Sequence, residues 1–351
     1  MKKIKVLVVD DSALVREIMS QGLSMDPEIE VVGTAANPHV ARDKIAQFRP
    51  DVLTLDIEMP QMDGVEFLRR LMPQYPLPVV VVSALAQKGA VLTIEALEAG
   101  AVDVVPKPRL DIARGLNEMM SELRETVKNA ASTNVQGWKM AKQVTSQQNQ
   151  INSCALAEST DKVIAIGAST GGTEALRMIL KSFPPNMPGV VVVQHMPPGF
   201  TRHFAEHLNN ICNMDVQEAR SGDRVLPGRV LIAPGDFHMS VRRSGGIYRV
   251  VCQPGEKVCG HRPSVEVLFQ SVAHHVGTNA VGVILTGMGS DGAEGMLAMR
   301  KAGARTIAQD EATSIVFGMP KAAFERGGAE ALLPLHQIPS AIISLLSDSN
   351  Q

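Results

Sequence analysis

Five polar residues in the first third of the chain lie after apolar runs. Together they could bind a phosphoryl group. Asp10 and Asp11 follow the first run, Asp56 the second, Ser83 the third and Lys107 the fourth. Carboxylates are preferred ligands of Mg²⁺, and one carboxylate can also act as a nucleophile and form an aspartyl phosphate. An ammonium group can bind a phosphate oxygen, and a hydroxyl can hydrogen-bond to it. These residues predict a phosphoacceptor pocket with Asp10, Asp11 and Asp56 around Mg²⁺.

The apolar runs predict parallel strands that bring these residues together. Runs at 6–9, 51–55, 79–82 and 102–105 alternate with segments of helical periodicity. Ser12 is a suitable N-cap for the first helix. Because parallel strands end at one edge of a sheet, their terminal side chains converge there. Residues 1–128 are therefore expected to form a five-stranded, doubly wound parallel domain.

The same residues resemble a response-regulator receiver domain. The segments that carry the resemblance are the Asp pair after the first strand, L-D-I-E-M-P-Q-M-D-G around Asp56, S-A after the fourth strand and K-P after the fifth. The resemblance implies that Asp56 is phosphorylated and that Asp10 and Asp11 are the acids on the metal side. Many receivers have an aromatic switch residue three positions before the lysine, where this chain has Val104. The alternative is that these aspartates are only helix caps and turn residues.

A second group of residues has the composition of a serine hydrolase site. An apolar run at 163–166 enters a glycine-rich turn in which residues 167–171 fit G-x-S-x-G, with Ser169 at the centre and a helix expected from about Thr173. This spacing places a hydroxyl on a sharp turn near a helix N-terminus, where backbone N–H groups can stabilise negative charge. The same loop could instead cradle a phosphate or be a simple tight turn.

A nucleophilic serine needs a base, and the base needs an orienting acid. His195 ends the next apolar run and Asp291 follows a later one, so both are expected at the same sheet edge as Ser169. His261, on a loop rich in Gly and Pro, is the rival base or a substrate contact. A pair at i and i+4, His203 and His207, could bind a metal, but a solvated helix face is favoured.

Residues 162–346 are similar to the catalytic domain of chemotaxis receptor methylesterases, so with the receiver the match covers nearly the whole chain. The segments that carry it are I-G-A-S-T-G-G-T-E-A, V-V-V-Q-H-M-P, L-I-A-P-G-D-F-H-M, G-H-R-P-S-V and I-L-T-G-M-G-S-D-G-A-E-G-M. The resemblance implies that Ser169 is the nucleophile, His195 the base and Asp291 the orienting acid. It implies that the N–H of Met288 and the turn at Thr170 serve the oxyanion.

The resemblance also implies the reaction and the partners. Family members hydrolyse glutamate methyl esters on chemotaxis receptors and deamidate specific receptor glutamines. A chemotaxis histidine kinase is the expected phosphodonor, contact with the membrane is expected only through receptors, and no cofactor is expected in the hydrolase site. The receiver is expected to cover the catalytic cleft until Asp56 is phosphorylated.

Composition and charge limit the alternatives. The 351 residues carry a formal net charge of −2, and neither half is basic enough to indicate nucleic-acid binding. This argues against a DNA-binding output, and the 167–172 loop lacks the lysine of a nucleotide-binding P-loop. The chain has four scattered Cys, no predicted signal peptide and no apolar stretch of about 20 residues, which predicts a reduced, cytoplasmic protein. The protein is expected to be a monomer.

The expected organisation is a receiver at 1–128, a polar linker at 129–160 and a catalytic domain at 161–351. The linker is rich in Gln, Asn, Ser and Thr and contains the only Trp, Trp138, either a docking anchor or a chance exposed aromatic. Apolar runs and turns after Lys162 predict a mostly parallel, doubly wound α/β domain of hydrolase type. Residues 242–252, around two glycines, predict a β-hairpin.

Overall fold

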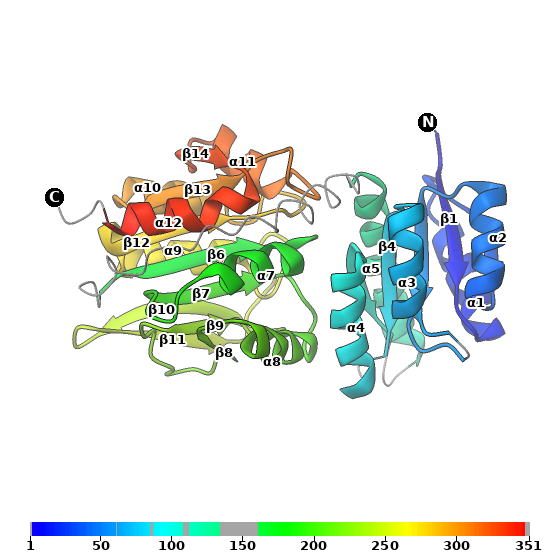
Figure 1. Cartoon of the computed structure of the whole chain (residues 1–351), viewed down its shortest axis with the longest axis horizontal. Helices are drawn as coiled ribbons and strands as arrows, with labels where there is room; N and C mark the ends of the chain where they lie inside the picture. The colour runs from blue at the N-terminus through cyan, green and yellow to red at the C-terminus, as the bar shows by residue number, and fades with distance from the viewer. Residues whose placement is uncertain (1, 61, 85–86, 108–111, 134–160, 348–351) are drawn as a thin grey trace. The chain divides into compact units, whose positions relative to one another are not determined.

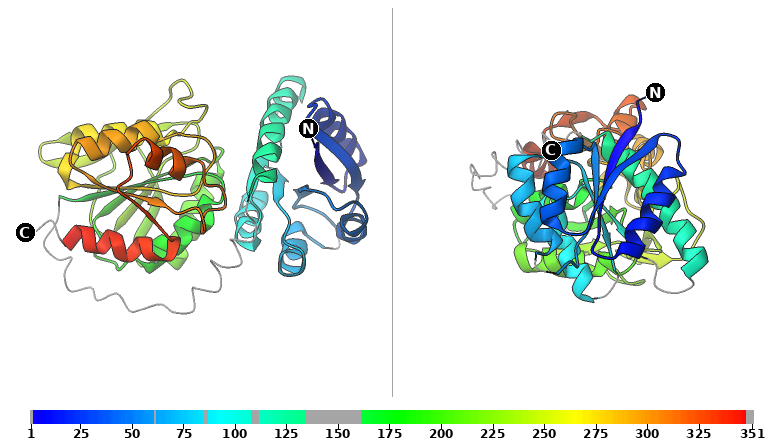
Figure 2. Two further views of the ribbon diagram at one scale, coloured as in Figure 1. Left: turned by 90° about the horizontal axis from the view of Figure 1, so that it is seen from above. Right: turned by 90° about the vertical axis from the view of Figure 1, so that its right-hand side faces the viewer.

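The computed structural model describes residues 2–60, 62–84, 87–107, 112–133 and 161–347 (Figure 1). The chain divides into two compact units, residues 1–136 and 137–351. Both units are α/β, with helices on the faces of a parallel sheet (Figure 2). Most of the expected linker, including Trp138, lies outside the described residues, as does Cys154. No helix among the described residues is both long and apolar enough to span a bilayer.

The first unit is a five-stranded parallel sheet with strand order β2-β1-β3-β4-β5. Its helices pack in pairs, α1 against α5 and α3 against α4. The strands are β1 (Ile4–Val9), β2 (Ile29–Ala35), β3 (Val52–Asp56), β4 (Val79–Ser83) and β5 (Asp103–Pro106). The helices are α1 (Ala13–Ser24), α2 (Pro38–Phe48), α3 (Gly64–Gln74), α4 (Gln87–Ala99) and α5 (Ile112–Ala131).

The apolar runs predicted as strands are buried because helices cover both faces of the sheet. All of β3 and β4 and most of β1 are inaccessible to solvent. Polar side chains fix where the helices begin: Ser12, Asn37 and Asp63 each accept a hydrogen bond from the backbone N–H three residues later. The N-cap predicted at Ser12 is thereby confirmed. The sheet therefore holds its strand ends at one edge, where the predicted phosphoacceptor residues lie.

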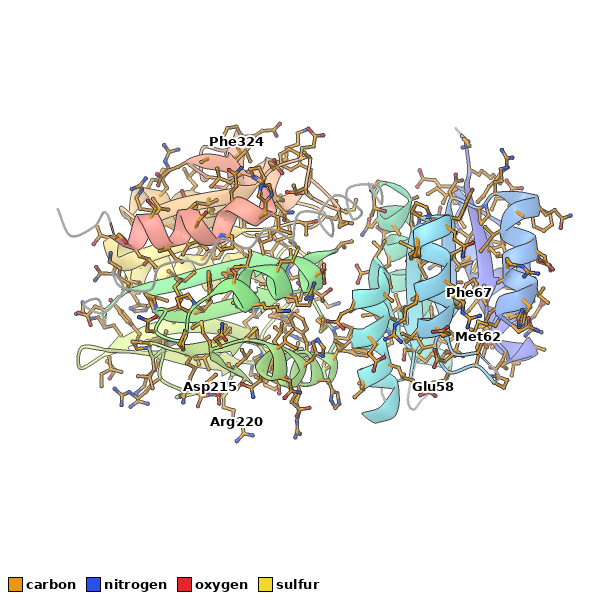
Figure 3. The ribbon with its side chains drawn as sticks, viewed as in Figure 1. Glu58, Met62, Phe67, Asp215, Arg220 and Phe324 are labelled. Carbon is orange, nitrogen blue, oxygen red and sulfur yellow. The ribbon has the colours of Figure 1, made fainter. Side chains whose placement is uncertain are left out.

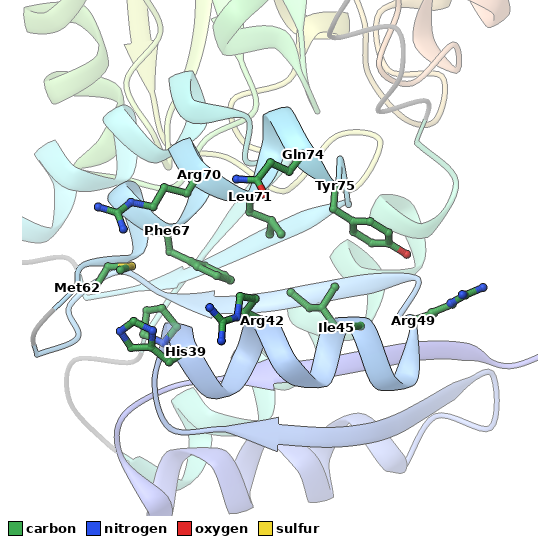
Figure 4. Close-up of a pocket in the computed structure, with 12 residues that line it drawn as sticks. His39, Arg42, Ile45, Arg49, Met62, Phe67, Arg70, Leu71, Gln74 and Tyr75 are labelled. Atoms are coloured by element: carbon green, nitrogen blue, oxygen red, sulfur yellow. The ribbon is translucent and has the colours of Figure 1, made fainter.

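A groove of about 660 Å³ separates α2 from α3 in the first unit. Met62 and Phe67 lie close together on its α3 side (Figure 3). Figure 4 shows Ile45 and Leu71 lining the groove from opposite helices. Its rim carries arginines, two of which already pair with acidic neighbours: Arg42 with Asp43 and Arg70 with Glu66.

The second unit contains a seven-stranded parallel sheet with strand order β14-β13-β12-β6-β7-β9-β8, and a separate antiparallel hairpin. The sheet strands are β6 (Val163–Ala168), β7 (Gly189–Gln194), β8 (Asp215–Glu218), β9 (Arg229–Ile232), β12 (Ala280–Ile284), β13 (Arg305–Gln309) and β14 (Ala331–Leu333). The hairpin strands are β10 (His238–Ser244) and β11 (Ile247–Gln253), as predicted from the sequence.

Helices α7 (Gly172–Ser182), α8 (Phe200–Ile211), α9 (Val265–His275), α10 (Ala293–Lys301), α11 (Met319–Glu325) and α12 (Ile338–Ser347) cover the sheet and the hairpin. The helix expected from about Thr173 thus begins one residue earlier. One core joins the sheet, α9 and the inner face of the hairpin, in which Val241, Tyr248 and Val250 are buried. Two single 3₁₀ turns, Gly277–Asn279 and Leu335–Gln337, complete the described structure.

Candidate active site and phosphoacceptor pocket

The three predicted catalytic residues follow adjacent strands at the centre of the large sheet. Ser169 follows β6, His195 follows β7, and Asp291 lies in the loop after β12. The chain moves outward from β6 through β7 on one side and returns through β12 on the other. Such a reversal of strand order leaves a crevice at the carboxyl ends of the strands, where ligands of α/β proteins bind.

The structure brings these three side chains into one hydrogen-bonded chain. His195 Nδ1 lies 3.1 Å from Ser169 Oγ, and His195 Nε2 lies 2.7 Å from Asp291 Oδ2. An ionised carboxylate can only accept, so the proton of a neutral imidazole lies on Nε2 and Nδ1 is free to accept from the serine hydroxyl. The imidazole is thus oriented as a base toward Ser169, by the opposite ring nitrogen from that in the chymotrypsin arrangement.

Asp291 is held at the start of α9 by several donors. Ser264 Oγ donates to it at 2.8 Å, and the backbone N–H groups of Val265 and Glu266 donate at 2.7 and 3.0 Å. Burial alone would raise the pKa of Asp291, but the hydrogen bond and charge of His195, with the Ser264 and Glu266 donors, lower that pKa below its usual value. The carboxylate is therefore ionised and fixed in position at neutral pH.

The turn that carries Ser169 needs glycine at two positions. Gly171 has φ of +77°, a left-handed conformation that side chains other than glycine rarely adopt. A Cβ on Gly172 would lie 2.2 Å from Oε1 of Gln194. Ser169 itself is only 8% exposed, so its hydroxyl lies at the floor of the site rather than on an open surface.

Gln194 links the turn at Ser169 to His195, a contact that was not predicted from the sequence. Its Nε2 donates to the carbonyl oxygens of Ser169 at 2.9 Å and of His195 at 3.1 Å. The side chain is 3% exposed. The only available signal was its place directly before His195 in the apolar run, where a polar side chain at a buried position needs partners.

His261 lies against the base instead of replacing it. Its ring stacks on that of His195 with centroids 3.7 Å apart and 11° between the planes. Burial, followed by the charge of His195, lowers the pKa of His261 to about 4. His261 is therefore neutral at physiological pH. Among the described histidines, His195 is the one that contacts the hydroxyl of Ser169.

The loop after β12 comes close to the nucleophile. A Cβ on Gly287 would lie 2.7 Å from Cβ of Ser169, so only glycine allows this approach. Thr286 Oγ1 donates to the carbonyl oxygen of Thr170, which joins the two loops. Met288 follows with a side chain that is 40% exposed. The oxyanion roles of Met288 and Thr170 remain predictions, because no donor distance from their N–H groups fixes the oxyanion position.

The phosphoacceptor residues also converge, at the carboxyl edge of the first sheet. Lys107 Nζ lies 2.9 Å from Asp10 Oδ2 and 2.8 Å from Asp56 Oδ2. One oxygen each from Asp10, Asp11 and Asp56 lies within 4.8 Å of the others. Three convergent carboxylates fit Mg²⁺, which takes one or two carboxylates and retains several waters.

Burial and ion pairing act in opposite directions on the pKa values of Asp56 and Lys107. Asp56 is 5% exposed, and burial raises its pKa above the usual value even though the hydrogen bond and charge of Lys107 oppose the rise. Burial would lower the pKa of Lys107, but Asp56 and Asp10 together raise it. Ser83 is fully buried with its hydroxyl 3.4 Å from the carbonyl oxygens of Ala84 and Gly89. Val104, at the position of the aromatic switch, is buried in β5.

Comparison with known proteins agrees with both sites. Residues 6–117 match the response regulator receiver domain, and residues 164–342 match the CheB methylesterase family. A protein-glutamate methylesterase/protein-glutamine glutaminase of Syntrophotalea carbinolica is 65% identical over 348 residues, 99% of each chain. A protein of the same name from Salmonella typhimurium is 52% identical over 99% of this chain and 98% of its own.

This chain belongs to the CheB methylesterase family. The crystal structure of the Thermotoga maritima CheB methylesterase catalytic domain is 41% identical, covers 53% of this chain and 100% of that one, and has a TM-score of 0.52. The predicted family, fold class and hydrolase activity are thereby confirmed, and so is a response regulator role. The catalytic and phosphoacceptor roles that we propose for individual residues rest on the geometry described above.

Proposed function

We propose that this CheB family member is a phosphorylation-activated serine hydrolase. It removes methyl groups from glutamate methyl esters on chemotaxis receptors and deamidates specific receptor glutamines. The observation that carries the proposal is the continuous hydrogen-bonded chain from Ser169 through His195 to Asp291. A base within reach of the hydroxyl and an acid behind the base are the requirements of nucleophilic catalysis by serine.

In the first step, Ser169 Oγ attacks the ester carbonyl carbon while His195 Nδ1 takes the hydroxyl proton. Asp291 stabilises the imidazolium that forms. As the tetrahedral intermediate collapses, the bond to the methoxy group breaks and His195 returns its proton to methanol. Backbone N–H groups near Thr170 and Met288 serve the oxyanion, each donor contributing about 3 kcal/mol to transition-state stabilisation in comparable sites.

In the second step, after methanol has left, water hydrolyses the acyl-enzyme. His195 removes a proton from water, the resulting hydroxide attacks the acyl-enzyme, and Ser169 leaves with the proton that His195 returns. The products are the free enzyme and a glutamic acid side chain, which releases its proton to water and becomes a carboxylate at neutral pH. A glutamine side chain enters the same sequence with ammonia as the leaving group, so one site supports both activities.

We also propose that the receiver pocket controls this reaction. Asp56 accepts a phosphoryl group from a phosphohistidine of the chemotaxis kinase, the bond to the histidine nitrogen breaking as the bond to the carboxylate oxygen forms. Asp10, Asp11 and Asp56 would hold Mg²⁺, which would neutralise charge on the phosphoryl oxygens. Lys107 contacts the phosphoryl group and Ser83 donates to it. Phosphorylation can shift a population only if the group interacts differently with the two states.

Regulation of the hydrolase by the receiver is tested by removing the receiver. If residues 161–351 form the catalytic domain and the receiver inhibits it, the isolated domain hydrolyses receptor esters faster than the unphosphorylated full chain. The match of that region to a relative whose catalytic domain was crystallised alone makes the fragment a practical one. Equal rates for the fragment and the unphosphorylated full chain would rule out inhibition by covering.

The nucleophile is tested by covalent labelling. A fluorophosphonate probe is expected to modify Ser169 in the wild-type chain and to leave Ser169→Ala unlabelled. Ser244→Ala, an exposed serine at the end of β10, is the matched control and labels normally. Labelling that persists in Ser169→Ala at the wild-type rate would assign the nucleophile to another residue.

A further inference from the structure

Three arginines lie side by side on the exposed face of the β10–β11 hairpin. Arg249 of β11 is directly opposite Arg242 of β10, and on its other side it pairs with Arg224 in an antiparallel bridge. Residues directly opposite one another in antiparallel strands place their side chains on the same face, about 5 Å apart. Arg224, Arg249 and Arg242 thus form one row, called the arginine row below.

The arginine row has no acidic partner within the part of the chain that the structure describes. All three side chains are exposed. Arg249 donates to the carbonyl oxygen of Gly222 at 2.6 Å, and no ion pair forms with any member of the row among the described residues. Asp223, the nearest acid in sequence, instead accepts from Arg220 N and Gln217. Like charges directly opposite each other destabilise a sheet, so the row does not stabilise the hairpin.

The surrounding segment is strongly basic although the whole chain is slightly acidic. Residues 220–250 contain six arginines and no lysine, against two acids, Asp223 and Asp236. The segment therefore carries a net charge of +4 in a chain whose formal net charge is −2. Guanidinium groups bind carboxylates with two parallel hydrogen bonds, which makes such a row suited to a partner with several carboxylates.

We propose that the arginine row docks an acidic segment of the substrate protein, beside the glutamate that reacts at Ser169. The inference rests on the proposed function, since that function supplies a partner rich in glutamate. Each turnover converts a neutral ester into a carboxylate, so a substrate with several target positions becomes more acidic as it is processed. A cationic surface away from the reacting atoms binds such a segment without taking part in the chemistry.

The hairpin that carries the row begins shortly after β9, a strand of the same sheet as the strands before Ser169 and His195. β10 starts at His238, whose Nε2 lies 2.8 Å from the carbonyl oxygen of Glu256 in the loop that leads to His261. Arg242 is four residues further along β10, about 13 Å at the rise of an extended strand. A helix of about 20 residues spans about 30 Å. A segment of that length exceeds the separation of His238 from Arg242, as the proposal requires.

The test is charge reversal in the full chain, Arg242→Glu with Arg249→Glu. The control is Lys301→Glu with Lys321→Glu, which changes the charge equally on α10 and α11. Turnover is measured on methylated receptor and on a small N-acylated glutamate methyl ester. We expect KM for the receptor to rise at least fivefold in the row variant only, with kcat unchanged and small-ester hydrolysis at the wild-type rate. Arg242→Gln with Arg249→Gln, which avoids new carboxylates, is expected to raise KM about half as far on a logarithmic scale.

Four results would overturn the proposal. They are an unchanged receptor KM in both row variants, an equal rise in the control, a parallel loss of small-ester hydrolysis, and faster small-ester hydrolysis by the unphosphorylated row variant. The last result would assign the row to the receiver of this same chain. Failure of the wild-type chain to hydrolyse either ester would instead contradict the proposed function, so the two failures are distinguishable.

Discussion

The imidazole of His261 lies nearly parallel to that of His195, with ring centroids 3.7 Å apart. His195 is held at its edge by Ser169 and Asp291, and His261 covers one of its faces. A ring fixed at both its edge and its face cannot turn away from the serine without losing contacts. His261 is thus a positioning residue in our account.

Replacing the stacking ring tests this role. His261→Phe retains a flat ring and is expected to keep kcat within about threefold of wild type. His261→Ala removes the ring and is expected to lower kcat about 10- to 100-fold with little change in KM, because loss of orientation acts on the chemical step. For both variants, kcat and KM are measured from steady-state hydrolysis of the ester. If Phe and Ala lower kcat equally, His261 acts through its nitrogen atoms.

His261 also predicts how stability depends on pH. Its pKa is about 4 in the folded chain and 6.5 in the unfolded chain, so the unfolded state takes up a proton first as pH falls. The contribution of this residue is complete above pH 6.5 and is lost between pH 6.5 and 4. The pKa difference corresponds to at most ~3.5 kcal/mol at ~1.4 kcal/mol per pKa unit, and partial exposure reduces this to about 2 kcal/mol.

His261→Phe lacks this titration. Its free energy of unfolding, from urea titrations at several pH values, should fall less than that of wild type between pH 7 and 4.5. Identical pH slopes for the two proteins would contradict the neutral, partly buried state of His261.

Gln194 is expected to matter for catalysis although it does not touch substrate. Gln194→Leu leaves the carbonyl oxygens of Ser169 and His195 without their shared donor. The expected result is a 10- to 100-fold lower kcat and a loss of about 1–3 kcal/mol in the free energy of unfolding. Gln337→Leu, an exposed glutamine in the same unit, is the control. Wild-type kcat in Gln194→Leu would show that the backbone holds the two residues unaided.

Ser264 supports Asp291 through one of several donors. Ser264→Ala removes a 2.8 Å hydrogen bond but leaves the backbone donors of Val265 and Glu266. We expect kcat to fall about tenfold, against about 10³- to 10⁴-fold for Asp291→Asn, which disturbs the histidine tautomer. The measurement is the steady-state kcat for ester hydrolysis by the two variants. Equal losses would mean that the backbone donors do not hold the carboxylate.

Much of both sites was predictable from sequence because parallel strands end at one edge. The runs that end at Asp10, Asp56 and Lys107 form β1, β3 and β5 of one parallel sheet, and their terminal side chains meet as expected. The catalytic residues were predictable for the same reason. Ser169 and His195 follow adjacent strands, β6 and β7, which brings the two residues to one edge of the sheet.

Other features of the structure depend on side-chain rotation, loop position and strand register, which the spacing of residues along the chain does not determine. The ring nitrogen that faces Ser169 depends on the rotation of His195 about its side-chain bonds. The stack of His261 depends on a loop that crosses from the hairpin to α9. The arginine row depends on strand register, since a shift of one residue would send Arg242 to the opposite face.

The most direct test is methanol release from receptors with labelled methyl esters, measured for the wild-type chain and for Ser169→Ala, with and without a small phosphodonor and Mg²⁺. We expect the wild-type chain to release methanol at a rate that increases with the phosphodonor, and Ser169→Ala to release none above background under either condition. Methanol release from Ser169→Ala at a rate near that of wild type would contradict the proposed role of Ser169.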